Sequence, residues 1–262
     1  MIKVAVCGIG RTGSEVIRAI LKNERFSLAA AFCRAGSEKA GQDVGTLLQL
    51  APVGIVAMEI SQADQVLAET DVDVFIDFSN PVSTKALLRA CKKRRIPGVI
   101  CTTGFTEADL LWISDFVAHS NLGVVYAPNV TLGVNVLLAA LKIVARALPE
   151  FDYCITETHH NQKFDIPSGT AKKLAGAIRR ELPQGAEVPI HSVRAGGYVG
   201  VHTVLLASDD ERLSLTHESF SRRAFVSGAL TAAKFILGRT GWYDMEDVLG
   251  LTERLESAAS AV

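Results

Sequence analysis

The chain of 262 residues has few cysteines and none of the spacings by which cysteine binds metal. Its five cysteines stand far apart, without a CxxC or CxH pair. An odd number of scattered cysteines in apolar segments is typical of reduced, buried thiols. We therefore expect neither a disulfide framework nor a metal site.

The sequence also lacks an excess of charge of one sign and a long hydrophobic run. A formal net charge of −1 gives no general attraction to nucleic acid or to an anionic membrane. The most apolar helical stretch, residues 132–148, is short and contains Asn135, Lys142 and Arg146, so it does not predict a transmembrane helix. The first residues show a strand pattern instead of a signal peptide. We expect a cytoplasmic protein that binds neither nucleic acid nor membrane.

What the first half does contain is a regular alternation of short apolar runs and amphipathic helical patterns. This alternation is typical of a parallel sheet covered on both faces, the doubly wound or Rossmann-type α/β architecture. We expect strands at residues 3–7, 28–33, 72–78, 98–101 and 123–126, and helices at 13–22, 64–69, 81–95 and 107–120.

The second half has a different order of patterns, in which consecutive strand patterns are joined by short turns. Such an order predicts a second α+β domain with an antiparallel or mixed sheet. We place a first domain at residues 1–128, to which residues 238–262 return, and a second at 129–237. The expected elements of the second half are helices at 132–148, 168–181 and 222–237, and strands at 153–160, 190–195, 199–207 and 212–218.

A glycine-rich motif follows the first expected strand directly. Gly8-Ile9-Gly10-Arg11-Thr12-Gly13 has the GxGxxG spacing and opens the first helix. In this context the glycines allow a tight turn and let a pyrophosphate approach the free N–H groups of the helix. The motif predicts a dinucleotide site, and the alternative is a strand-to-helix turn without a ligand.

The end of the second strand indicates which nicotinamide cofactor is preferred. An acidic residue there favours NADH, whereas an arginine can accommodate the 2′-phosphate of NADPH. The strand ends Phe32-Cys33-Arg34 and has no carboxylate at its tip. NADPH is therefore favoured over NADH, unless Arg34 is only a solvated surface charge.

A polar cluster precedes the helix expected at residue 168. Ser168 is a candidate N-cap, so the N–H groups of Gly169 and Thr170 could bind a carboxylate or phosphate. Lys163 brings positive charge close by, and His159 is suited to proton transfer. The cluster fits an anionic substrate that is protonated as it is reduced, and the alternative is a surface loop with an ordinary helix cap.

Residues 157–171 resemble the signature E-x-H-H-x-x-K-x-D-x-P-S-G-T-A of the dihydrodipicolinate reductase family. The resemblance extends over nearly the whole chain. Further matching segments are Phe75–Ser79, Thr102–Phe105, Ala127–Asn129, Gly133–Asn135, Ser192–Gly196, Gly200 with His202–Thr203, Glu211–Leu213, Thr216–His217 and Tyr243–Met245.

The resemblance implies a role for each part of the site. His159 and Lys163 would be the catalytic proton donors, and His160, Lys163, Gly169 and Thr170 would bind the substrate carboxylates. The cofactor would be bound by Gly8, Ile9, Gly10, Arg11, Thr12, Gly13, Arg34, Cys101, Thr102, Thr103, Ala127, Pro128, Asn129 and Val130.

The resemblance also implies a reaction and an assembly. NAD(P)H would reduce 4-hydroxy-tetrahydrodipicolinate, a cyclic dicarboxylate, to tetrahydrodipicolinate with loss of water, in lysine and diaminopimelate biosynthesis. The second domain would bind substrate and assemble a homotetramer through its sheet. Two alternatives stay open: a related imine or amino-acid dehydrogenase with another anionic substrate, and a non-catalytic NAD(P)-binding regulator.

The chain departs from the family pattern at three places. The glycine loop is one residue shorter than the usual GxxGRMG and has Thr12 where the family has methionine. Cys33 stands where an acid is common, and Val201 replaces the usual glutamate before the later histidine. The first two departures concern the geometry and preference of the cofactor site, and none affects His159 or Lys163.

Overall fold

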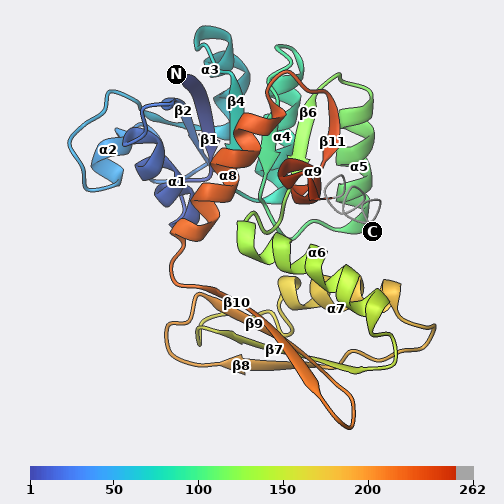
Figure 1. The fold of residues 1–262 in the computed structure, drawn as a ribbon. Helices are drawn as coiled ribbons and strands as arrows, with labels where there is room; N and C mark the ends of the chain where they lie inside the picture. Colours follow the sequence, from blue (N-terminus) through green and yellow to red (C-terminus); the bar gives the residue numbers. More distant parts are fainter. Residues whose placement is uncertain (252–262) are drawn as a thin grey trace. The chain divides into compact units, whose positions relative to one another are not determined.

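The computed structural model describes residues 1–251, which form two compact units. The first unit comprises Met1–Val130 and the described residues from Phe225 onward, and the second comprises Thr131–Ala224. Each unit has one sheet with helices packed on it (Figure 1).

The first unit is built on a seven-stranded sheet in the order β11-β6-β5-β4-β1-β2-β3, in which every neighbouring pair is parallel. The chain leaves β1 toward β2 on one side and returns to β4 on the other. In doubly wound folds, ligands bind at the carboxyl ends of the strands where the order reverses in this way. The strands are β1 (Ile2–Cys7), β2 (Phe26–Cys33), β3 (Ala57–Glu59), β4 (Val74–Asp77), β5 (Gly98–Ile100), β6 (Gly123–Tyr126) and β11 (Gly241–Tyr243).

Helices cover both faces of this sheet. Buried leucines and isoleucines such as Leu67, Leu87 and Ile113 pack α3, α4 and α5 against one face, and α1 and α8 lie on the other (Figure 1). The predicted doubly wound α/β fold is confirmed. The helices are α1 (Arg11–Leu21), α2 (Val44–Leu47), α3 (Ala63–Glu69), α4 (Pro81–Lys92), α5 (Glu107–Ala118), α8 (Arg223–Ile236) and α9 (Met245–Leu249).

The second unit has a four-stranded mixed sheet in the order β10-β9-β7-β8. β7 is parallel to β8 and antiparallel to β9, and β9 is antiparallel to β10. Two helices cover one face of this sheet (Figure 1). The elements are α6 (Leu132–Ala147), β7 (Asp152–His159), α7 (Gly169–Glu181), β8 (Ile190–Arg194), β9 (Gly200–Ala207) and β10 (Arg212–Ser219).

Helix α8 belongs to the first unit from Phe225 onward, whereas the division drawn from the sequence places residues up to 237 in the second domain. Gly228 shows the physical reason, because a Cβ atom there would lie 1.6 Å from the carbonyl oxygen of Val130. Such close approach packs the helix on the first unit, although in sequence it directly follows strands of the second.

Short elements such as α2, β3, β11 and α9 are absent from the sequence prediction, because runs of three to five residues show no measurable periodicity. Residues 252–262, the end of the segment expected to return to the first domain, lie outside the described residues. Within residues 1–251, no helix has the length and apolar character needed to cross a membrane.

Candidate active site

The glycine loop between β1 and α1 has the geometry of an anion cradle. Gly8 has a φ of +93°, and a Cβ atom there would lie 2.4 Å from the carbonyl oxygen of Phe78. A Cβ atom at Gly13 would lie 1.8 Å from the Gly8 carbonyl oxygen, so both positions require glycine. At Gly10, by contrast, a Cβ atom would meet nothing within 4 Å. The backbone there is open to a ligand, and α1 has no side-chain cap over its first N–H groups. These residues fit the pyrophosphate of a dinucleotide.

The other expected cofactor residues follow the carboxyl ends of neighbouring parallel strands. Arg34 follows β2, residues 101–103 follow β5 and residues 127–130 follow β6, so all of them lie along one edge of the sheet. Cys101 and Thr102 are both buried at this edge.

Asp77, at the end of β4, organises this edge from inside. Its carboxylate is fully buried and accepts hydrogen bonds from the Ser79 N–H at 3.0 Å, the Thr102 hydroxyl at 3.0 Å and the Thr84 hydroxyl. Burial raises the pKa of Asp77 above its ordinary value, although these hydrogen bonds oppose the shift. One carboxyl group thus ties together β4, α4 and the segment after β5.

The tip of β2 is more densely charged than the sequence suggests. The Lys39 ammonium group donates to the carbonyl oxygen of Ile9 in the glycine loop. A carboxylate, Glu59, comes from the adjacent strand β3, where it pairs with Cys33. Glu59 accepts hydrogen bonds from the Gly36 N–H at 2.9 Å and the Ser61 hydroxyl at 3.2 Å, so both of its oxygens are already engaged.

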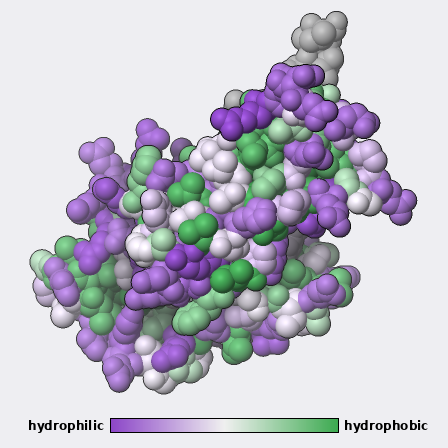
Figure 2. All heavy atoms as spheres, turned by 90° about the horizontal axis from the view of Figure 1, so that it is seen from below, coloured by the Kyte–Doolittle hydropathy of each residue, from purple (hydrophilic) through white to green (hydrophobic). Residues whose placement is uncertain are grey.

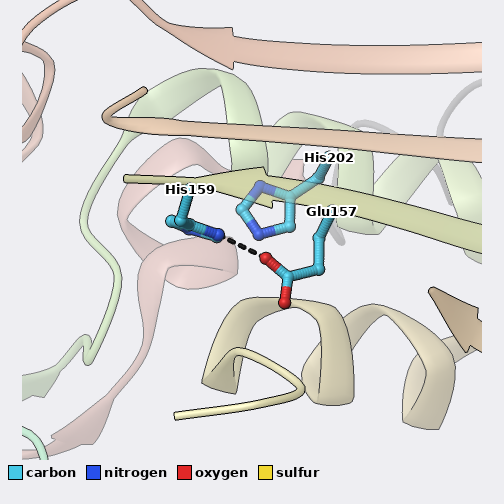
Figure 3. A group of neighbouring side chains, drawn as sticks. All are labelled: Glu157, His159 and His202. Atoms are coloured by element: carbon cyan, nitrogen blue, oxygen red, sulfur yellow. Dashed lines mark hydrogen bonds and ion pairs between the residues drawn. The ribbon is translucent and has the colours of Figure 1, made fainter. Parts of the chain in front are cut away.

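In the second unit, a buried carboxylate orients His159. Glu157 and His159 are two residues apart on β7 and share the face toward the helices. The Glu157 carboxylate bonds to Nδ1 of the His159 ring (Figure 3). On its other side Glu157 accepts two hydrogen bonds from Arg194, at 2.8 and 3.0 Å, and one from the Ser168 N–H at 3.2 Å.

The pKa values of this group follow from burial and partners. Burial would raise the pKa of Glu157, but the hydrogen bonds from Arg194 and His159 outweigh it and lower the pKa to about 2. Burial lowers the pKa of His159, and the opposing effect of Glu157 does not fully offset it. An ionised Glu157 can only accept, so it holds the His159 proton on Nδ1 and leaves Nε2 as the atom that exchanges protons.

Two further residues surround the His159 ring. Gly200 lies against Nε2, because a Cβ atom there would be 3.0 Å from it. His202 lies with its ring edge-on to that of His159, at a centroid distance of 5.1 Å, and its Nε2 is 3.2 Å from the Ser168 hydroxyl. Burial and the nearby His159 lower the pKa of His202 to about 4, so it is neutral at neutral pH.

Helix α7 begins beside this group. Its N-cap is Ser168, as expected, and the Ser168 hydroxyl accepts a hydrogen bond from the Ala171 N–H at 3.2 Å. Gly169 is exposed, and a Cβ atom there would meet nothing within 4 Å. Thr170 lies in the same first turn. The positive end of this helix therefore attracts carboxylates, and the Gly169 N–H already bonds to that of Asp165.

Lys163 and His160 lie in the loop between β7 and α7. The Lys163 ammonium group donates to Asp165 at 2.7 Å, and its backbone N–H donates to the His160 carbonyl oxygen at 3.1 Å. The His160 N–H donates to the Tyr198 carbonyl oxygen at 2.8 Å, which fixes this loop to the connection between β8 and β9. All the expected catalytic and substrate-binding residues thus lie around the carboxyl end of β7.

The ligand atoms of Glu157, His159 and His202 lie within 4.8 Å of one another, close enough in principle for a metal ion. The guanidinium group of Arg194, however, already contacts both carboxylate oxygens. A divalent cation would have to compete with that fixed positive charge, so the group is better described as a hydrogen-bonded assembly.

Two family models cover nearly the whole chain. The model of the dihydrodipicolinate reductase N-terminus matches residues 2–130, and that of its C-terminus matches residues 133–249. The chain belongs to the dihydrodipicolinate reductase family. This membership confirms both the resemblance in the motifs and the expectation of a reductase.

Individual members of the family match over almost their full length. A 4-hydroxy-tetrahydrodipicolinate reductase from Methanocaldococcus jannaschii is 36% identical over 271 residues, which covers 97% of this chain and 99% of that protein. A protein of the same name from Laribacter hongkongensis is 39% identical over 267 residues, covering 95% and 97%. The solved structure of dipicolinate-bound dihydrodipicolinate reductase from Paenisporosarcina sp. TG-14 has a TM-score of 0.76 at 24% identity, covers 94% of this chain and 98% of that one, and supports the fold.

Sequence reasoning leaves four residues of this dihydrodipicolinate reductase family member without a role. Glu157 could have been found, because it is two residues from His159 and therefore on the same strand face. Arg194 and His202 reach the site through strand pairing, Arg194 opposite His159 and His202 opposite Glu157. Asp77 lies within a motif that matches the family, but only its burial and hydroxyl partners show what it does.

Proposed function

We propose that this protein reduces 4-hydroxy-tetrahydrodipicolinate to tetrahydrodipicolinate with NAD(P)H and loss of water, in lysine and diaminopimelate biosynthesis. The observation that carries this proposal is the assembly around β7, in which Glu157 orients His159 beside Lys163 and the N-terminus of α7. The names of relatives with 36% and 39% identity support the choice of substrate.

The substrate carboxylates bind where the second unit offers positive charge and hydrogen-bond donors. The N–H groups of Gly169 and Thr170 lie at the positive end of α7, and Lys163 and His160 lie on the loop before it. Asp165 is the present partner of Lys163. A substrate carboxylate takes over that ammonium group from Asp165 when it binds.

Proton transfer is assigned to His159 with Lys163. Nε2 of His159 is the atom that faces away from Glu157, and the imidazole is neutral in the free protein because burial lowers its pKa. Carboxylates of a bound substrate favour the protonated form, so the ring gains a proton when it is needed. NAD(P)H supplies the hydride when it is bound.

The first unit is proposed to hold the cofactor through residues 8–13 and the backbone of the segments after β5 and β6. We propose NADPH as the preferred form. Arg34 and Lys39 supply positive charge at the end of β2, and the nearby carboxylate of Glu59 is engaged by Gly36 and Ser61. A 2′-phosphate therefore meets two cationic side chains there and one carboxylate, that of Glu59.

The second unit is proposed to assemble a homotetramer through the sheet face that its helices leave uncovered. Alternate residues point to this face, where apolar or weakly polar side chains such as Val193, Val201 and Leu205 lie among charged ones such as Arg212 and Glu218. The view from below in Figure 2 shows hydrophobic and hydrophilic residues interspersed. We also propose that the protein is cytoplasmic, where NAD(P)H is at hand for biosynthesis.

The test is a coupled assay in which the substrate is generated enzymatically just before use and NADPH or NADH oxidation is followed. The proposal predicts oxidation that depends on this substrate, with a higher kcat/KM for NADPH. Turnover only with imines of other amino acids would indicate a related dehydrogenase instead. Cofactor binding without any turnover would indicate a non-catalytic regulator.

A further inference from the structure

We propose that Arg194 is a positioning residue that couples His159 to the loop carrying Lys163, through the buried carboxylate of Glu157. The proposal rests on the proposed function only for the roles of His159 and Lys163. The coupling itself is a statement about geometry in the ligand-free protein.

The guanidinium group of Arg194 uses every one of its N–H donors. Its two terminal nitrogens donate to the two oxygens of Glu157 at 2.8 and 3.0 Å. The remaining donors bond to three carbonyl oxygens: those of Lys163 at 3.2 Å, Asp165 at 2.7 Å and Val193 at 2.8 Å. Five donors in a rigid plane meet five acceptors, an arrangement that lysine cannot reproduce with one nitrogen.

These bonds join two parts of the site that are distant in sequence. Toward the sheet, Arg194 fixes the orientation of Glu157, which in turn holds Nδ1 of His159. Toward the loop, the same group binds the backbone of Lys163 and of Asp165, its ionic partner. The side chain of Arg194 is only 12% exposed and that of Glu157 is fully buried, so water does not compete strongly for these bonds.

Loss of this bonding pattern would affect the site itself as well as the stability of the fold. If Glu157 loses its guanidinium partner, its carboxylate can rotate, and the His159 proton is no longer confined to Nδ1. At the same time the backbone on both sides of Phe164 loses its anchor, so Lys163 and the start of α7 no longer keep a fixed separation. Small displacements of such groups lower both ligand affinity and rate.

The experiment compares Arg194→Lys and Arg194→Ala with wild type, and uses Arg146→Lys as the matched control. Arg146 lies in the same unit and makes a two-point pair with Glu181, at 2.6 and 3.3 Å, but its side chain is 70% exposed. The readouts are the ¹⁵N chemical shifts of the His159 ring in the ligand-free protein, the dissociation constant of dipicolinate and the thermal unfolding midpoint.

The proposal predicts a mixture of His159 tautomers in both Arg194 variants and dipicolinate binding weakened by roughly tenfold or more. Added guanidinium ion should restore part of the affinity in Arg194→Ala, and Arg146→Lys should match wild type. A pure Nδ1–H tautomer with dipicolinate affinity within about twofold of wild type in Arg194→Lys would contradict the proposal, whatever the unfolding midpoint.

The tautomer measurement requires neither turnover nor ligand. If the wild-type protein failed to reduce the substrate but the His159 tautomer still depended on Arg194, the proposed function would be wrong and the coupling would stand. If Arg194→Ala did not fold, Arg194→Lys would still decide the question, because it keeps the positive charge and loses only the five-donor geometry.

Discussion

Glu157 keeps its charge inside the protein because its partners replace water. Its carboxylate is fully buried, yet two bonds from Arg194, one from Ser168 and one from His159 keep it ionised. A buried carboxylate without them would be protonated at neutral pH. The free-energy cost of burying this charge is therefore offset by these hydrogen bonds. The buried carboxylate in turn fixes the orientation of the His159 imidazole.

Replacing Glu157 with Gln should lower the pKa of His159 further. Burial already lowers this pKa, and the hydrogen bond and negative charge of Glu157 are the effects that oppose it. Titration of the His159 ring signals by NMR in the two proteins measures the change. A His159 pKa that stays the same or rises would contradict this account of the site.

At the scale of elements, the glycines of the loop between β1 and α1 serve two different purposes. Gly8 and Gly13 are required by close backbone contacts, whereas Gly10 faces open space. The first use concerns folding of the strand–helix unit and the second concerns access for a ligand.

Gly8→Ala should therefore affect mainly the stability of the fold, and Gly10→Ala mainly the binding of the cofactor. Alanine at position 8 has an unfavourable positive φ and a Cβ atom 2.4 Å from a carbonyl oxygen, so the variant should lose about 1–3 kcal/mol or more of unfolding free energy. Gly10→Ala should unfold like wild type but bind NADPH more weakly. Thermal unfolding and NADPH fluorescence titration measure the two effects. Equal effects of both substitutions on both quantities would show that the loop does not work in this way.

The elements that the sequence predicts well are those with several turns or with caps. Ser168 marks the start of α7 correctly, and the long apolar pattern of α6 gives its bounds to within one residue. What the sequence does not predict is how strands pair. β7 and β8 turn out to be parallel neighbours, although a loop and α7 separate them, and this pairing brings Arg194 beside His159.

Because strand pairing is not predicted, the candidate site can be predicted only in part from the sequence. His159, Lys163 and the start of α7 lie within a dozen residues and are found as one motif. Glu59 reaches the tip of β2 from another strand, and the charge balance at the cofactor end depends on it. Contacts of this kind depend on which strands become neighbours in the sheet, which local residue patterns do not specify.

At the scale of the whole molecule, buried histidines make stability depend on pH. Burial and the neighbouring His159 lower the folded-state pKa of His202 to about 4, whereas the unfolded chain has the ordinary value of 6.5. Between these values the unfolded state binds more protons, so the stabilisation is complete above pH 6.5 and is lost as the pH falls toward 4. Burial also lowers the pKa of His159 and His217, which act in the same direction.

His202→Asn should flatten this part of the stability curve. The titration of His202 accounts for at most roughly 3 kcal/mol between the two pH values, and the variant should lose that share of the dependence. Urea unfolding followed by circular dichroism at several pH values between 6.5 and 4 measures it. A variant with the same slope as wild type over this range would show that His202 is not buried in its neutral form.

The central claim is that His159 and Lys163 act on 4-hydroxy-tetrahydrodipicolinate, and its most direct test is turnover by His159→Ala and Lys163→Ala. NADPH oxidation is followed with freshly generated substrate, and circular dichroism and NADPH binding confirm that each variant is folded and binds cofactor. The account predicts that each substitution lowers kcat/KM about 100-fold or more while NADPH affinity stays within about twofold of wild type. Wild-type rates in both variants would contradict the claim.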